Sequence, residues 1–330
     1  MKLATYKDGS RDGQLVVVSR DLTTAHYATG IASTLQQVLD DWNFLAPQLQ
    51  DLSVALNRVG DGHPSNSQVR HAFPFLSQQC MAPLPRACQW VVGTAYTNPE
   101  ALLYQSASDN LLGPCDDVAC VSEAHGIDFE AGLAVMTGDV PLGATPAQAL
   151  DGVRLVLLAN AVSLRHLMPA ELTRGLGWLQ SKPATAFSPV AVTLDELVFS
   201  GVNAWENGRL HLTLQSTWNG RKVGLCEAGQ EMKVSFGQLI VHLTKTRRVR
   251  AGSLIGSGAV SNQDSRQGYS SIAEKRALET LQDGRPTTEF MQYGDIIRIE
   301  MKGRDGKSLF GAIEQEIIPA EPAPTGLRAR

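Results

Sequence analysis

Several residues that could do chemistry lie in extended or turn segments of the sequence. Asp128 and Glu130 are two positions apart in an extended segment, so both side chains point to one face of a sheet. Such a pair could share a cation or act as acid and base, but a solvent-facing edge strand has the same pattern. Lys182 and the loop 256–258 (Gly-Ser-Gly) could present a charge and backbone N–H groups to an anionic ligand, although such loops are commonly only connections.

Cysteine and the basic residues give weaker signals. The five cysteines are an odd number and include no Cys-x-x-Cys pair, which fits neither a disulfide framework nor a zinc site. We therefore expect a cytoplasmic protein. The basic run 245–250 is short and is expected to be the solvated end of a helix, where cations complement the helix dipole.

The composition is that of a chain with enough apolar material for a large core. It has 330 residues, 43% of them hydrophobic, and 29 Lys and Arg against 33 Asp and Glu give a formal charge of −4. This balance lacks the clustered positive charge that nucleic-acid binding needs. No run approaches the roughly 18 apolar residues of a membrane-spanning helix, and the N-terminus lacks the apolar segment of a signal peptide. We expect neither nucleic acid nor a membrane as partner.

Two regions of different character follow one another. An apolar β-branched run over 15–19 and apolar residues at helical spacing over 35–56 predict a small α+β unit. Residues 81–85 (Met-Ala-Pro-Leu-Pro) form a stiff connector, because each proline fixes its own φ and biases its predecessor away from helix. We place an N-terminal domain at 1–80, a larger domain at 81–318 and a Pro-rich disordered tail at 319–330.

Strand signals dominate the larger region. The turn dipeptides Asn219-Gly220 and Asp305-Gly306 predict two hairpins, which join 210–215 to 222–223 and 296–301 to 309–313. Helices are expected to begin near Thr145 and, at a capping-box spacing, at Ser271. Further strands are predicted at 90–96, 128–136, 153–163 and 190–194, and a further helix at 234–243. Many short strands and few helices favour an α+β, mostly β fold in which sheets pack on sheets or form a roll.

These segments give the sequence a resemblance to the fumarylacetoacetate hydrolase family, and within it to a bacterial group of about this length. The motifs occur in the family's order, and the match reaches from the N-terminal domain to about residue 316. They are 126–130 (GIDFE), 155–160 (LVLLAN), 162–165 (VSLR), 180–183 (QSKP), 188–193 (SPVAVT), 252–258 (GSLIGSG), 268–270 (GYS) and 272–276 (IAEKR). The resemblance implies a small N-terminal α+β domain followed by a mixed β-sandwich roll of the family's type, usually paired as a homodimer.

The resemblance also implies an activity. Family members typically bind Mg²⁺ or Ca²⁺ through four carboxylates and use the ion to hold a 1,3-diketo acid. A hard divalent ion prefers oxygen ligands, polarises the carbonyl and stabilises the enolate that leaves when the C–C bond breaks. A histidine in a loop over the site activates the attacking water.

This chain departs from the family at most of those positions. Glu130 matches the first acid of the family's Glu-x-Glu pair, but Gly132 stands at the second. Val92 and Ala161 stand at the two aspartate positions. Because three of the four side chains donate no oxygen, we expect no metal cofactor and an empty metal site.

Other parts of the catalytic machinery differ as well. After Asn98 the chain runs directly into 99–104 (PEALLY), so the family's catalytic histidine and much of its loop are missing from the sequence. Ala259 replaces a threonine that contacts substrate after Gly258 in relatives. We therefore expect the usual hydrolysis to be lost.

The remaining matched positions predict a pocket. Lys182 could be a base or a Schiff-base nucleophile if burial lowers its pKa, or it could form a structural ion pair with Glu130, the commoner fate of a buried lysine. His166 could replace the lost base, although a lone histidine is more often packed or solvent-facing. Lys182, Glu130 and His166 are thus the candidate catalytic residues. The candidate substrate contacts are Tyr104, Gln105, Ser108, Asp109, Arg165, Gly258 and Ala259.

Three functional hypotheses follow. The first is a metal-independent catalyst that acts on a β-dicarbonyl or related keto compound in a specialised pathway. The second is a non-catalytic protein that keeps the ligand pocket and the dimer. The third is a conventional metal hydrolase with substitute ligands such as Asp109 or Asp128.

Overall fold

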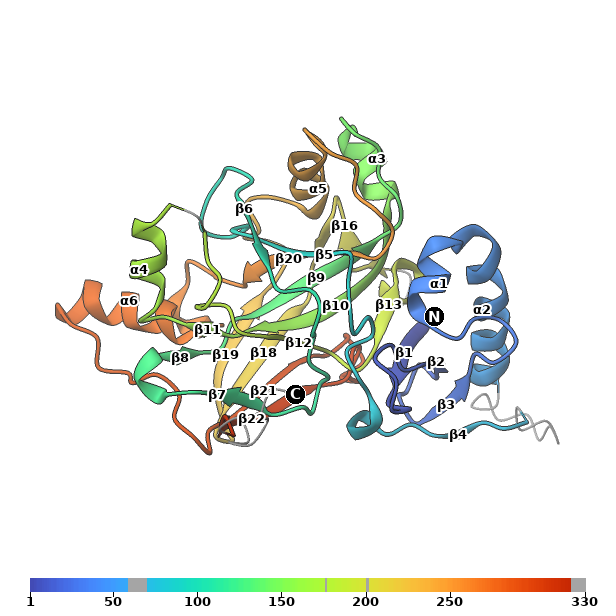
Figure 1. Ribbon diagram of the computed structural model, residues 1–330, viewed down its shortest axis with the longest axis horizontal. Helices are drawn as coiled ribbons and strands as arrows, with labels where there is room; N and C mark the ends of the chain where they lie inside the picture. Colours follow the sequence, from blue (N-terminus) through green and yellow to red (C-terminus); the bar gives the residue numbers. More distant parts are fainter. Residues whose placement is uncertain (59–69, 176, 200–201, 322–330) are drawn as a thin grey trace, which may run out of the picture.

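A large mixed sheet forms the centre of the computed structural model, which describes residues 1–58, 70–175, 177–199 and 202–321 (Figure 1). Among the described strands of this sheet, only one neighbouring pair, β20 with β5, is parallel. The strand order is β4 (Phe73–Pro74), β3 (Thr24–Tyr27), β2 (Gln14–Val18), β1 (Lys2–Tyr6), β13 (Ala191–Thr193), β10 (Val153–Ala161), β9 (Ala131–Thr137), β20 (Ser253–Ala259), β5 (Gln89–Gly93) and β6 (Leu103–Ser106), with β12 (Thr185–Phe187) paired to β10.

A second, five-stranded sheet packs on one face of the first. Its order is β19 (Arg221–Glu227), β18 (Thr213–Trp218), β21 (Ile296–Met301), β22 (Ile313–Pro319) and β7 (Val118–Cys120). Alternate residues of β9 and β10, such as Leu133 and Leu158, share a buried core with Leu214, Ile297 and Ile299 of the second sheet. Because successive side chains of a strand point to opposite faces of the sheet, every second residue of these strands faces the other sheet and forms this sandwich core.

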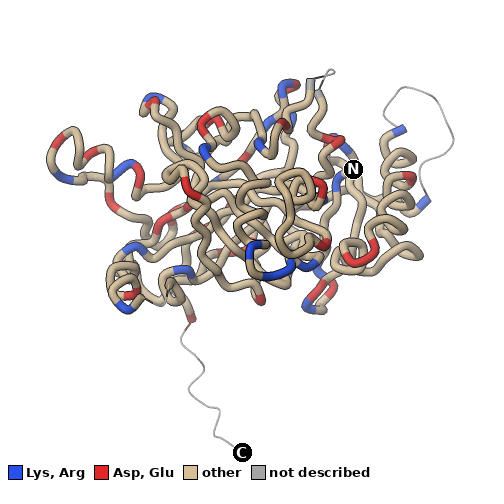
Figure 2. Tube along the Cα trace, turned by 90° about the horizontal axis from the view of Figure 1, so that it is seen from above, with Lys and Arg blue, Asp and Glu red and all other residues tan. Residues whose placement is uncertain are grey.

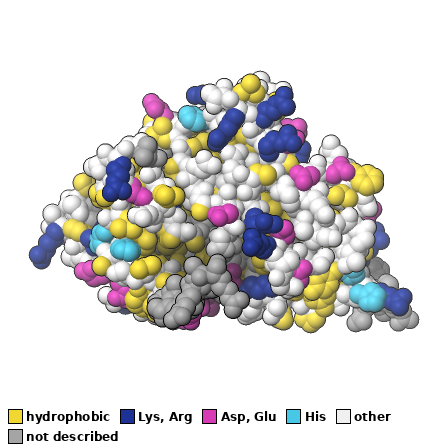
Figure 3. All heavy atoms as spheres, viewed as in Figure 1, with side chains coloured by type: hydrophobic (Ala, Val, Ile, Leu, Met, Phe, Trp, Pro, Cys, Tyr) yellow, Lys and Arg dark blue, Asp and Glu magenta, His cyan; other side chains and the backbone are white. Residues whose placement is uncertain are grey.

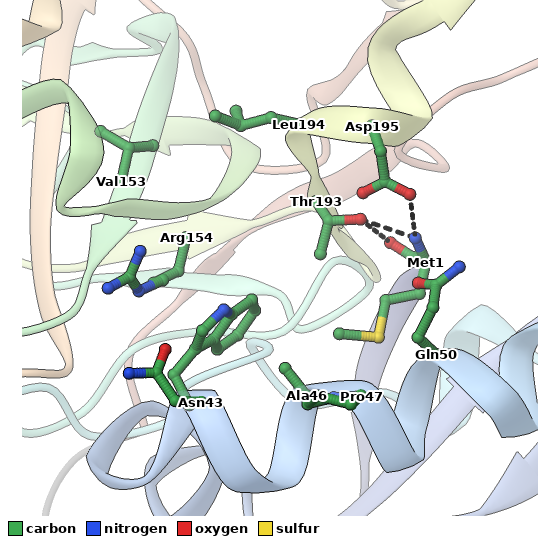
Figure 4. A pocket seen from close by; sticks show the side chains of 11 residues that line it. Met1, Asn43, Ala46, Pro47, Gln50, Val153, Arg154, Thr193, Leu194 and Asp195 are labelled. Atoms are coloured by element: carbon green, nitrogen blue, oxygen red, sulfur yellow. Dashed lines mark hydrogen bonds and ion pairs between the residues drawn. The ribbon is translucent and has the colours of Figure 1, made fainter.

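The N-terminal unit joins the same large sheet. β1 pairs with β13 through Lys2–Val192 and Leu3–Ala191, so one sheet continues across the predicted boundary at residue 81. Figure 4 shows how the chain start is held there, with the amino group of Met1 donating to Thr193 Oγ1 at 2.6 Å and lying 3.6 Å from Asp195. The predicted α+β, mostly β fold with a small N-terminal α+β unit and a β-sandwich roll is confirmed.

Helices cover the sheet and flank its ends (Figure 1). The helical region predicted at 35–56 is two helices, α1 (Leu35–Asp40) and α2 (Trp42–Asn57), because Asp41 leaves helical geometry at φ −131° and ψ 52°. The others are α3 (Pro146–Asp151), α4 (Met168–Thr173), α5 (Phe236–Thr244) and α6 (Ile272–Asp283). Helices therefore begin at the predicted caps Thr145 and Ser271, but the Glu274 carboxylate accepts from Ser270 N rather than closing a capping box.

Short elements complete the described chain. Two-residue strands pair as β8 (Ile127–Asp128) with β11 (Ser163–Leu164), β14 (Val198–Phe199) with β15 (Val202–Asn203), and β16 (Trp205–Glu206) with β17 (Arg209–Leu210). Single 3₁₀ turns lie at η2 (Ser77–Gln79), η3 (Glu123–His125), η4 (Leu194–Leu197) and η5 (Ser265–Gln267).

Some predicted strands differ from the observed ones. The strand predicted at 128–136 breaks between β8 and β9, which leaves Glu130 at the break. The hairpin across Asn219-Gly220 is confirmed. The chain also pairs across Asp305-Gly306, since Leu309 N donates to Met301 O at 3.0 Å, but most of β21 pairs with β22 at 313–319 rather than with 309–313. β22 continues to Pro319 and the Ala320 N–H donates to Cys120 O at 2.9 Å, so the predicted tail begins later than residue 319. Residues 322–330 of that tail lie outside the described residues.

The surface carries charges of both signs. Acidic and basic residues are scattered over a mostly uncharged trace in Figure 2, and on the face seen in Figure 3 neutral and hydrophobic side chains lie between them. Among the residues that the structure describes, no helix combines the length and apolar character that a membrane crossing requires.

Candidate functional site

A cavity of about 260 Å³ lies where β5, β6 and β20 meet the break between β8 and β9. Its wall brings together six of the residues predicted from the sequence: Tyr104, Glu130, Arg165, Lys182, Gly258 and Ala259. Lys182 reaches it from the turn before β12, whereas 256–258, predicted to be a loop, lies within β20. A register shift between Gly256 and Ala259 forms a bulge there, and Gly258 adopts φ +78°, a conformation that favours glycine.

A buried network of two acids and two cations forms one side of the cavity. Arg165 bridges both acids, with Nε 2.8 Å from Asp128 Oδ2 and an Nη 2.7 Å from Glu130 Oε1. Lys182 Nζ lies 2.9 Å from the same Glu130 oxygen. Ser163 Oγ accepts from Lys182 at 2.6 Å and donates to Glu130 Oε1 at 2.6 Å. The two acids thus share a cation, and the alternative of a solvent-facing edge strand is wrong, since Asp128 is 0% and Glu130 8% exposed.

Asp128 also binds the first turn of helix α6. Its two carboxylate oxygens accept from Ile272 N at 2.6 Å and Ala273 N at 3.0 Å. These are free N–H groups of the first helical turn, where the helix dipole favours negative charge. Asp128 therefore ties α6 and Arg165 to the same place.

Burial and charge act against each other on the pKa values of this network. Burial works to raise the pKa of Glu130, but Lys182 and Arg165 outweigh it and hold that pKa at about 2. Burial raises the pKa of Asp128 against the opposing charge of Arg165. Burial lowers the pKa of Lys182, with Glu130 opposing. The result is a charge-balanced cluster whose members are poorly solvated.

Aromatic rings form the opposite wall. Tyr104 and Trp178 meet edge to face with ring centroids 4.6 Å apart. Lys182 Nζ lies 5.1 Å from the Tyr104 centroid and 5.9 Å from that of Trp178, within the range of cation–π attraction. Thr94 Oγ1, Tyr104 OH and Trp178 Nε1 are buried without a hydrogen-bond partner in the described part of the chain. They are available to a ligand that carries oxygen acceptors.

Two family models account for almost the whole chain. The model for the fumarylacetoacetase N-terminal domain 2 matches residues 1–86, and the model for the fumarylacetoacetate (FAA) hydrolase C-terminal domain matches residues 82–318. The chain belongs to the fumarylacetoacetate hydrolase family. A comparison with curated proteins returned no match.

Similar solved structures agree with this family fold. The fumarylacetoacetate hydrolase of psychrophilic Exiguobacterium antarcticum shares 17% identity at a TM-score of 0.64, with 97% of this chain and 100% of that chain covered. The maleylpyruvate hydrolase of Sphingobium sp. SYK-6, in complex with manganese(II) ion and pyruvate, shares 14% at 0.65, with 97% and 100% covered. The 2-hydroxyhepta-2,4-diene-1,7-dioate isomerase of Mycobacterium marinum shares 16% at 0.61, with 98% and 100% covered. The fold is thus that of family hydrolases and isomerases.

The positions at which the resemblance predicts metal-binding carboxylates do not fit a divalent cation in this chain. Val92 is buried in the apolar core, and Ala161 offers only a methyl group. A Cβ built on Gly132 would lie 2.3 Å from the carbonyl oxygen of Gly258, so the bulge of β20 fills the space of a side chain. Three donors already converge on Glu130 Oε1. Among the described residues, no group of three His, Cys, Asp or Glu side chains could hold a metal ion.

Four predicted site residues lie away from the cavity. Gln105 is exposed because it follows Tyr104 in β6, where neighbouring side chains face opposite ways, and Ser108 and Asp109 lie farther along the same edge. His166 is also exposed, with Nδ1 2.8 Å from Ala124 O and its ring against Phe290 at 5.2 Å. It is thus not positioned for the proton transfer predicted for it.

Several residues that line the cavity, Glu274 and Trp178 among them, were missed from the sequence. Glu274 was noted only as a helix-cap residue, yet it lies in the cavity wall, and burial raises the pKa of its carboxyl group. Its Oε2 accepts from Ser270 N at 3.2 Å and Ser261 Oγ donates to Oε1. Trp178 gave no signal, because a lone tryptophan in a loop carries no pattern. The IAEKR segment could have pointed to Glu274, because this family motif forms the first turn of α6.

Proposed function

We propose that this cavity binds a β-dicarbonyl or related keto compound and transforms it without a bound metal ion, in a specialised pathway. One observation carries the proposal: the cavity and its cations remain, while the bulge of β20 fills the second carboxylate position at Gly132. Arg165 and Lys182 can receive carbonyl or carboxylate oxygens, and the unpartnered Thr94 and Tyr104 hydroxyls can receive further acceptors. A related hydrolase that holds pyruvate together with manganese is consistent with a keto-acid ligand.

The chemistry we propose is proton transfer beside the carbonyl group. A carboxyl group in the cavity wall can accept a proton from the carbon beside the carbonyl group and return it, and Glu274 is such a group, with a pKa that burial raises. Negative charge that develops on the keto oxygen during this step can be stabilised by Lys182 and Arg165, which are fixed in place by Glu130 and Asp128. An enolate is likewise the fragment that leaves in C–C cleavage and the nucleophile that adds in condensation.

The proposal can be tested with pyruvate by following exchange of its methyl protons in D₂O by NMR. We expect exchange that survives treatment with a chelator and falls at least tenfold in Lys182→Ala, Glu130→Gln and Glu274→Gln. His166→Ala, which alters an exposed side chain next to Arg165, is the matched control and should leave the rate unchanged. If the exchange rates of Lys182→Ala and Glu130→Gln both equal that of the parent protein, neither residue takes part in the mechanism. A stoichiometric divalent ion in the purified protein would revive the conventional hydrolase.

A second candidate is a non-catalytic ligand-binding protein. It is favoured by the balance of the buried network, in which each cation already lies beside a carboxylate. A thermal-shift panel of keto acids separates the two: stabilisation by a ligand without exchange or turnover supports this candidate. We also propose the family's homodimer, which sedimentation can test.

A further inference from the structure

Lys182 presents an amine to the cavity from a fixed position. Two directions around Nζ are taken by Glu130 Oε1 at 2.9 Å and Ser163 Oγ at 2.6 Å. Beyond them lie the faces of Tyr104 and Trp178, whose ring centroids are 5.1 and 5.9 Å away. A ring face does not hold an N–H proton as an oxygen acceptor would, and Lys182 lines the cavity although it is only 5% exposed. An electrophilic carbon in the cavity would meet this side of the amine.

We propose that Lys182 forms a covalent iminium with the carbonyl carbon of the keto ligand, and this rests on the proposed function only for the class of ligand. The nitrogen lone pair forms the new C–N bond while the C=O bond pair moves to oxygen. Two protons that leave Lys182 Nζ go to that oxygen, which departs as water as the C=N bond forms. The ammonium and ketone thus give a protonated imine and water, with no oxidant or reductant and no change in charge.

The network around Lys182 suits this product. Because the iminium keeps the positive charge of the ammonium, Glu130 keeps its counter-ion and the balance with Arg165 and Asp128 is undisturbed. Ser163, which accepts from Lys182 and donates to Glu130, can pass a proton away from nitrogen, and Glu274 in the same wall can supply one to the departing oxygen.

The cavity walls favour the same step. Tyr104 and Trp178 place apolar ring surface beside Lys182, which disfavours the water that would hydrolyse an imine, and their π faces attract a cation. An iminium withdraws electrons from the neighbouring carbon and so can support loss of a proton or cleavage of a C–C bond there. The iminium on Lys182 would thus provide electron withdrawal from a side chain of the protein itself.

Borohydride trapping tests the inference. The purified protein is incubated with pyruvate or acetoacetate, reduced with sodium borohydride and analysed by intact mass and peptide mapping. With pyruvate we expect one adduct, of the mass of pyruvic acid less one oxygen atom, on the peptide that contains Lys182. Lys182→Arg keeps a cation beside Glu130 but should lose the adduct, whereas Lys222→Arg, at an exposed lysine, should keep it. Thermal unfolding checks that both variants fold.

The outcomes separate this inference from the proposed function. No adduct with either probe, or adducts spread over exposed lysines with Lys182 unmodified in the parent protein, overturns the iminium whatever the variants do. Proton exchange or keto-acid binding without an adduct overturns the iminium and leaves the proposed function standing. Neither binding nor exchange with any keto compound overturns both.

Discussion

Replacing Gly132 by alanine asks whether the second carboxylate position of the family has room for any side chain in this protein. A Cβ there would lie 2.3 Å from Gly258 O, 3.1 Å from Gly258 C and 3.3 Å from Ser257 Oγ. The nearest two atoms are backbone atoms of β20, which is hydrogen-bonded to β9 on one side and to β5 on the other. No rotamer change removes the clash, so β20 itself must shift.

Opposing terms set the expected size of the effect. Gly→Ala at a backbone geometry that alanine tolerates stabilises a protein by about 0.4–1 kcal/mol, because the unfolded chain loses entropy. Forcing an extra carbon into a packed interior costs about 1–3 kcal/mol. We therefore expect Gly132→Ala to lower the free energy of unfolding by about 1–2 kcal/mol, and Gly132→Glu to lower it further because a carboxylate would also be buried.

Urea denaturation followed by fluorescence measures this difference, with a constant m-value as the check that only stability has changed. Gly138→Ala, directly after β9, is the matched control. A Cβ there would meet Arg154 Nε at 3.0 Å, an atom of a long side chain that can move, so we expect a change within about 0.5 kcal/mol. If Gly132→Ala is as stable as the parent protein, the position has room for a side chain and our steric argument against a metal site is wrong.

Two further predictions concern the acids that hold the cavity walls. Asp128→Asn should lower the free energy of unfolding by about 2–3 kcal/mol in the same urea assay, because Arg165 loses a buried counter-charge and α6 loses a charged cap. Asp139→Asn, in an exposed pair with Arg250, should change the free energy of unfolding little. Equal effects of the two substitutions would contradict this account. Burial works to raise the pKa of Glu171, but donors from Ser181 and the backbone of 179–181 hold it at about 2. Since the folded pKa lies below the ordinary value, the stability that Glu171 contributes is present above about pH 4.5 and is lost as the pH falls toward 2. Glu171→Gln should therefore flatten the pH dependence of the free energy of unfolding in that window. An unchanged pH profile would refute this prediction.

Features that depend on neighbouring residues could be predicted from the sequence. The Asn219-Gly220 turn dictates the β18–β19 hairpin, and the caps Thr145 and Ser271 start helices where expected. The Asp305-Gly306 turn also forms, but the register of β21 could not be predicted, because the pairing shifts between the contact of Met301 with Leu309 and that of Ile299 with Ile313. Long-range pairing, such as β1 with β13, depends on packing that no local pattern contains.

The site divides in the same way. Motif order identified the segments that carry Glu130, Arg165 and Lys182, and the structure brings these into one network. The sequence motifs could not predict that His166 turns outward to Ala124 while Glu274 lies in the cavity wall. The direction in which a single side chain points depends on the elements that pack against it, and those elements come from distant parts of the chain.

Residue identity alone determined that Val92, Gly132 and Ala161, the positions at which the resemblance to the family predicts carboxylates, have no oxygen in their side chains, because a side chain's donor atoms do not depend on its surroundings. Only the tertiary structure decided that Gly132 lies against Gly258, more than a hundred residues later in the chain, and that Arg165 and Lys182 both bind the remaining acid, Glu130. The physical reason is that chemistry resides in single side chains, whereas space and charge balance arise from strands that meet only when the sheet forms.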